Sequence, residues 1–159
     1  MALTKINNNT LSAVTTLPSA IATGRVLQII QATSTSATDS STQSFVATNL
    51  TASITPSSSS NKILIIASGL YDLNGNARQA LFAVYRNTTN ISGGGGTSFS
   101  MPYSTNSRAI STLSVNQLDT PNTTSSTSYT IRIRATSAGA VEFISQGTEA
   151  YIQLMEILA

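Results

Sequence analysis

The sequence predicts an all-β protein: an antiparallel β-sandwich, jelly-roll-like and with about eight strands, preceded by an extended N-terminal arm. Three observations predict this fold class. Ser, Thr and Asn recur throughout the chain and disfavour helices, because their side chains compete for backbone hydrogen bonds. Short segments of alternating apolar and polar residues recur, and polar runs containing Pro, Asn or Gly separate them. Hydrophobic residues make up 40% of the 159 residues, which excludes a disordered chain.

Residues 1–24 are expected to form the arm, and residues 25–159 the sandwich domain. The arm is rich in Asn, Thr and Ala and carries a single charge, Lys5. Its spaced apolar residues favour attachment to a larger assembly or to a neighbouring subunit; a frayed terminus is the alternative. No long apolar run occurs in the sequence, so neither a signal peptide nor membrane insertion is expected. The candidate attachment residues are Leu3, Ile6, Leu11, Val14 and Leu17.

The strands of the sandwich domain are expected where β-branched and aromatic residues alternate with polar ones. The strand YTIRIRA shows the pattern most clearly, because Tyr129, Ile131 and Ile133 fall on one face while Arg132 and Arg134 fall on the other. It follows the turn-like run LDTPNTTSST, and ITPSSSSNK precedes the strand ILIIASG in the same way. The predicted strands cover residues 25–33, 44–55, 62–71, 79–87, 109–118, 128–136, 140–146 and 149–158.

Two strands carry apolar residues on both faces. In KILIIASG and AYIQLMEILA, Ile, Leu and Met occupy successive positions, whereas the outer face of a monomeric sandwich should be polar. A second surface must therefore cover them. A homo-oligomer interface is the simplest cover, and burial under the protein's own arm and loops is the alternative.

The side-chain inventory argues against an enzyme. The chain has no His, which removes Ser-His-Asp and Cys-His systems and imidazole metal sites. It has no Cys either, and its six acidic residues form no recognisable catalytic pair. Glu142 and Glu149 instead flank a predicted hairpin at SQGT. The eight basic residues form no cluster, so nucleic-acid binding is not expected. No catalytic, cofactor-binding or metal-binding residue is predicted.

Two loop motifs have structural explanations. DLNGNARQALFA places oxygen ligands like the start of a calcium-binding EF-hand loop, but the bidentate Glu is replaced by Ala83, so an Asn-Gly hairpin is the better interpretation. ISGGGGTSF lacks the Lys-Ser/Thr of a phosphate-binding loop and is interpreted as a surface loop.

The connection over residues 88–107 is the longest without a strand pattern, and long loops on β-scaffolds often carry recognition. Phe99, Met101 and Tyr103 are its candidates for stacking on a sugar, and packing within the protein is the alternative. Arg132 and Arg134 could bind an anionic glycan, with an ordinary solvated face as the default.

Several motifs together resemble a β-module common in virion proteins of tailed bacteriophages, particularly of aquatic and cyanobacterial hosts. These are GRVLQ, SITPSSSSNKILIIASG, LDTPNTTSSTSYTIRIRA and the closing YIQLMEI, in that order over residues 24–159. The resemblance implies a homotrimeric fibre, knob or decoration element on the outside of a phage particle, attached to other virion proteins by its arm. A tail-fibre or receptor-binding role that contacts host-surface glycan is favoured. The alternatives are a capsid decoration or head-fibre protein and a stand-alone carbohydrate-binding module.

Overall fold

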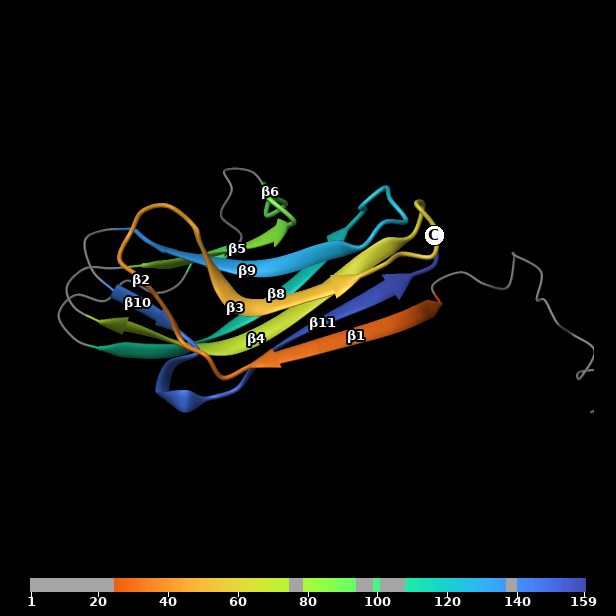
Figure 1. The fold of residues 1–159 in the computed structure, drawn as a ribbon. Coiled ribbons are helices and arrows are strands. Elements are labelled where there is room, and N and C mark those ends of the chain that lie inside the picture. The colour runs from red at the N-terminus through yellow and green to blue at the C-terminus, as the bar shows by residue number, and fades with distance from the viewer. Residues whose placement is uncertain (1–24, 75–78, 94–98, 101–107, 137–139) are drawn as a thin grey trace, which may run out of the picture.

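The structure is a computed structural model that describes residues 25–74, 79–93, 99–100, 108–136 and 140–159. The predicted arm, with its five candidate attachment residues, lies outside the described residues. Two antiparallel sheets pack face to face, with the second sheet lying across the first (Figure 1). The first sheet contains β1 (Val26–Ser34), β2 (Thr38–Ser40), β4 (Lys62–Asn74), β8 (Ala109–Asp119), β10 (Ala140–Phe143) and β11 (Ala150–Ile157). The second contains β3 (Val46–Ile54), β5 (Ala80–Arg86), β6 (Thr89–Asn90), β7 (Phe99–Ser100) and β9 (Thr127–Ala135).

The strand order is that of a jelly roll. One edge of β4 pairs with β8, and the other edge pairs first with β11 and then with β10. On their far sides, β11 pairs with β1 and β10 pairs with β2. In the second sheet β9 lies between β3 and β5, and β6 and β7 both pair with β5. The pairs β1 and β2, β6 and β7, and β10 and β11 can each be counted as one interrupted strand, which leaves eight strands. Numbered from 1 to 8 along the chain, these strands follow the order 1-8-3-6 in the first sheet and 2-7-4-5 in the second. This order confirms the predicted jelly-roll-like antiparallel sandwich.

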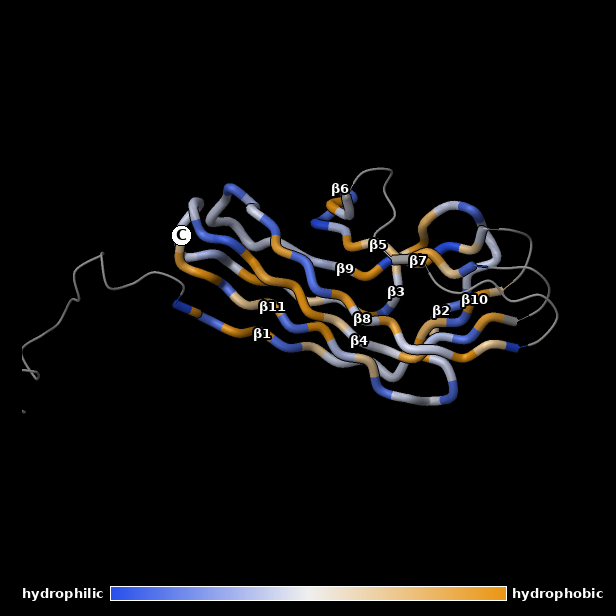
Figure 2. Tube along the Cα trace, turned by 180° about the vertical axis from the view of Figure 1, so that it is seen from behind, coloured by the Kyte–Doolittle hydropathy of each residue, from blue (hydrophilic) through white to orange (hydrophobic). Residues whose placement is uncertain are grey.

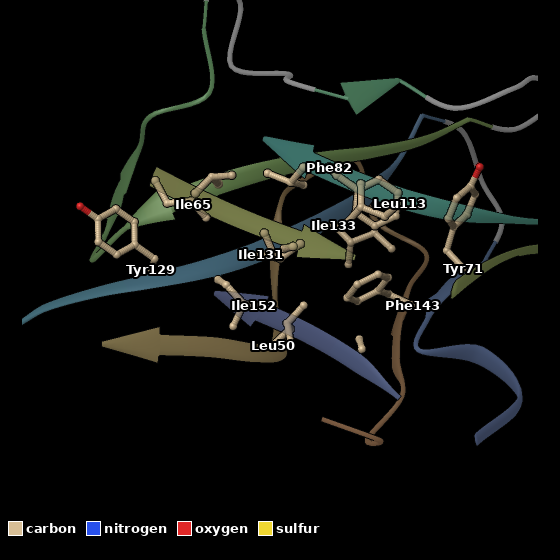
Figure 3. Close-up of a cluster of buried hydrophobic side chains, with 14 of the residues drawn as sticks. Leu50, Ile65, Tyr71, Phe82, Leu113, Tyr129, Ile131, Ile133, Phe143 and Ile152 are labelled. Carbon is tan, nitrogen blue, oxygen red and sulfur yellow. The ribbon is translucent and has the colours of Figure 1, made fainter. Parts of the chain in front are cut away.

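The hydrophobic core fills the space between the two sheets. In Figure 3, Leu50, Ile131 and Ile133 of the second sheet meet Ile65 and Ile152 of the first, and all five are almost fully buried. At one end of the core, three aromatic rings pack edge to face. Phe82 lies 5.3 Å from Tyr71 and 5.4 Å from Phe143 between ring centroids.

Each of the eight predicted strands overlaps an observed one, with bounds that mostly differ by one or two residues. The two largest differences are of three residues each: β4 continues to Asn74 rather than residue 71, and β10 ends at Phe143 rather than residue 146. The short strands β2, β6 and β7 were not predicted. Consequently the connection over residues 88–107, predicted to lack strands, pairs with β5 through β6 and β7. In the part of the chain that the structure describes, no helix is long and apolar enough to cross a membrane.

The predicted hairpin at SQGT is wrong. β10 and β11 do not pair with each other, because both run along the same edge of β4, and the 3-10 turn η2 (Ser145–Gly147) lies between them. Gly69 of β4 lies at this break. A Cβ on Gly69 would come within 2.8 Å of the Phe143 ring and the Ala150 methyl group, so glycine leaves room for these two side chains to pack against β4.

The predicted Asn-Gly hairpin is also wrong. Its flanking strands, β4 and β5, belong to different sheets, so the connection crosses from one layer of the sandwich to the other. Asn-Gly is a local turn signal. The sheet that the following strand joins depends on long-range packing, which a local signal does not contain.

Candidate functional site

The outer face of the first sheet carries an apolar row four strands wide. Its members are Ile29 of β1, Met155 of β11, Leu64 of β4 and Leu118 of β8, each directly opposite the next in the strand register. Side chains alternate between faces along a strand, and the neighbours of Leu64 on β4 are buried in the core, so the row points away from it. Ile29 is 56% exposed and Leu118 54%, while Met155 and Leu64 are half-buried. We call these four residues the outer row.

More apolar surface adjoins the outer row. Val26 and Ile157 lie opposite each other on one side of it, and Ile66 lies on the other. Figure 2 shows hydrophobic segments on the neighbouring strands β1, β11 and β4. The next row is largely polar, and there the Gln153 amide donates to the Gln31 side chain at 2.6 Å. These strands are therefore apolar on both faces, as predicted, and among the described residues no strand covers their outward side chains.

A second cluster lies on the outer face of the second sheet, formed by Phe45, Tyr85, Arg132 and Arg134. The guanidinium carbon of Arg132 lies 4.1 Å from the centre of the Tyr85 ring, and that of Arg134 lies 5.1 Å from the Phe45 ring. The two rings contact each other edge to face with centroids 6.0 Å apart. We call these four residues the arginine–aromatic cluster. The alternating sequence of β9 predicted that both arginines lie on this face. Burial along β9 confirms the prediction, because fully buried residues alternate with half-buried ones and both arginines are half-buried.

The arginines of this cluster have no carboxylate partner. All six acidic side chains of the sequence lie in the described residues, and none is within ion-pair distance of Arg132 or Arg134 there. The Nε atoms of both guanidinium groups are buried without a hydrogen-bond partner. The clearest polar contact of the pair joins Arg134 Nη1 to the backbone oxygen of Gln43 at 3.1 Å.

Hydroxyl groups adjoin the arginine–aromatic cluster on the same face. Thr51 of β3 lies 2.9 Å from Thr130 and 3.2 Å from Ser128, both of β9, measured between side-chain oxygens. Thr130 is also directly opposite Tyr85 of β5. The outer face of the second sheet thus combines cations, aromatic rings and hydroxyls, whereas that of the first carries the apolar outer row.

The predicted receptor-contact residues fall only partly within the described structure. Phe99 begins β7, and its backbone pairs with Phe82 of β5, while Met101 and Tyr103 lie outside the described residues. Sequence reasoning missed Phe45 and Tyr85, because neither stands in a conspicuous motif. Tyr85 did carry a signal: it occupies a solvent-facing position of a predicted strand.

Two of the carboxylates form ion pairs within the fold. Asp119 pairs with Arg86 at 3.0 Å and accepts a hydrogen bond from the Tyr129 hydroxyl at 2.7 Å. Burial, helped by Asp119, raises the pKa of Tyr129 far above its usual value, so the phenol stays protonated. Asp72 pairs with Arg108. Among the described residues, no group of three or more His, Cys, Asp or Glu side chains could hold a metal ion.

Glu156 of β11 fastens the polar turn that precedes β4. Its side chain is fully buried and accepts hydrogen bonds from Gln28, from the backbone and hydroxyl of Ser57, and from Asn61, at 2.6–2.7 Å. Burial alone raises the pKa of a carboxyl, but these donors outweigh it and lower the pKa of Glu156 to about 2. The turns before β4 and β9 lie at the same end of the sandwich as the C-terminus (Figure 1), and a carboxylate, Glu156 or Asp119, lies beside each.

Comparison of the chain with known protein-family models and with curated protein sequences finds no match in either. Its function therefore has to be inferred from the fold, the two outer faces and the sequence motifs.

Proposed function

We propose that the chain is a structural protein of a bacteriophage virion, which assembles as a homotrimer and serves as a tail-fibre or receptor-binding component. The observation that carries the proposal is the outer row. A contiguous apolar stripe across four strands is unusual on a monomeric protein and is typical of an interaction surface. With few charges nearby, the stripe suits a self-interface, because homo-oligomer interfaces are more apolar than the rest of the surface.

Fold and motifs support the virion assignment by analogy. Double-sheet jelly rolls occur in viral capsid and lectin domains, although a fold by itself does not determine function. The order of the sequence motifs, which resembles phage virion modules, makes the analogy more specific. Arg25, the residue after the proposed attachment arm, is tied to the C-terminal end by the bond from the Leu158 amide to its carbonyl oxygen, at 2.9 Å. An arm that continues from Arg25 would start beside the outer row.

Solution mass tests the assembly. A trimer has three times the 16.6 kDa of one chain, about 50 kDa, by light scattering after size-exclusion chromatography. Leu64→Asp places a charge in the middle of the outer row and should yield a folded monomer. Asn116→Asp, on the same face of β8 but outside the row, is the matched control and should leave the mass unchanged. A wild-type mass of 16.6 kDa would contradict the proposal.

Competition experiments separate the two virion roles. If the chain is a receptor-binding component, the purified oligomer should reduce adsorption of the phage that carries it to host cells. If it decorates the capsid, the oligomer should instead bind particles that lack it and leave adsorption unchanged. Capsid decoration is the second candidate, because the predicted arm carries spaced apolar residues that suit attachment to a larger assembly.

A further inference from the structure

We propose that the outer face of the second sheet binds an anionic saccharide, whose carboxylate or sulfate group pairs with Arg132 and Arg134. The inference deepens the proposed receptor-binding role and rests on it for its biological meaning. It places the contact on a strand face and not in the loop that contains Met101 and Tyr103.

The first argument is charge. Arg132 and Arg134 are two residues apart on one strand and point to the same side, so their Cα atoms are about 6.6 Å apart and their charges repel. No carboxylate of the chain offsets them, although Arg86 and Arg108 each have one. An anion between the two guanidinium groups would remove the repulsion, and the planar fork of each group matches a carboxylate or sulfate.

The second argument is preorganisation. The Tyr85 and Phe45 rings hold the two guanidinium groups through cation–π contacts, which limits the side-chain entropy lost on binding. Arg132 lies between Ala47 of β3 and Ala83 of β5 in the strand register. Both neighbours are small, and the Arg132 side chain between them is half-buried.

The third argument distinguishes a saccharide from other anions. The hydroxyls of Thr51, Ser128 and Thr130 continue the same face beside Tyr85 and can exchange hydrogen bonds with sugar hydroxyls. Two arginines are too few for strong nucleic-acid binding, which depends on neutralising several phosphates. An acidic peptide could not add as a strand here, because β9 is already paired on both edges.

Isothermal titration calorimetry at low salt tests the proposal with four probes of similar length. These are an oligogalacturonate, a sulfated oligosaccharide, a neutral malto-oligosaccharide and an oligoglutamate. At least one anionic saccharide should bind saturably, and whichever binds more tightly identifies carboxylate or sulfate as the preferred group. The neutral sugar and the peptide should bind at least ~10-fold more weakly, equivalent to about 1.4 kcal/mol. Absence of saccharide binding, or equal binding of the peptide, would overturn the proposal.

Substitutions then locate the site. The double variant Arg132→Gln and Arg134→Gln should weaken binding by at least ~10-fold, because charged hydrogen bonds to the anion are lost. Arg25→Gln removes an exposed arginine elsewhere and should leave affinity unchanged. Replacing both with Lys keeps the charge without the fork and should give intermediate affinity, so the test survives if the Gln variant fails to fold. Wild-type affinity in a folded double variant would refute the assignment.

The solution mass of the same samples separates this inference from the proposed function. An oligomer that binds no anionic saccharide leaves the virion proposal standing and removes the binding site. A monomer that binds an anionic saccharide supports the binding site and contradicts the proposed homotrimer.

Discussion

Glu156 allows a quantitative prediction about acid stability. Its pKa is about 2 in the folded protein, against an ordinary value of 4.5 that the unfolded chain should retain. At about 1.4 kcal/mol per pKa unit, this difference is equivalent to roughly 3 kcal/mol of folding free energy. Because the folded pKa is the lower one, the stabilisation is fully present above pH 4.5 and is lost as the pH falls towards 2.

Glu156→Gln should abolish this contribution. The neutral amide cannot accept all four hydrogen bonds with the strength of a carboxylate, so we expect a loss of about 2–3 kcal/mol at pH 7. Other carboxylates also titrate in acid, so the difference between wild type and variant isolates Glu156. That difference should shrink steadily between pH 4.5 and 2.

Urea unfolding followed by circular dichroism at fixed chain concentration, from pH 7 down to 2.5, measures both curves. Fixed concentration matters because the stability of an oligomer depends on it. Glu149→Gln, an exposed carboxylate beyond η2, is the matched control and should retain the wild-type acid dependence. Parallel pH curves for wild type and Glu156→Gln would refute the reasoning.

Three further predictions concern the core and its edges. Gly69→Ala should lower the free energy of unfolding in urea by about 1–3 kcal/mol, because its Cβ would lie 2.8 Å from the Phe143 ring; a change of a few tenths would contradict the close approach. Ile65→Asp buries an unpaired carboxylate and should leave no cooperative thermal transition, whereas Leu64→Asp in the outer row should still fold. A wild-type melting temperature for Ile65→Asp would show that Ile65 is not in the core. Tyr129→Phe removes the hydrogen bond to Asp119 and should destabilise by about 1.5–3 kcal/mol in the same urea assay, with unchanged stability counting against that bond.

Much of the fold could be predicted from the sequence because strand signals are local. Alternation in YTIRIRA was sufficient to assign Tyr129 to the core and Arg132 to the outer face, and burial along β9 agrees. The apolar residues on both sides of β4 likewise identified a strand with an apolar outer face. Turn signals were weaker guides. Asn-Gly and SQGT lie within three residues of the ends of β4 and β10, but they did not reveal which strands pair.

By itself, the sequence determined the fold class, the strand positions and the absence of histidine and cysteine chemistry, because these follow from residue types and their local spacing. Tertiary structure decided which distant residues meet. The outer row joins positions 29, 64, 118 and 155, and the arginine–aromatic cluster joins Phe45 and Tyr85 to β9. Such sets depend on sheet order and register, which long-range packing of the core selects. Neither surface was therefore visible in any single stretch of sequence.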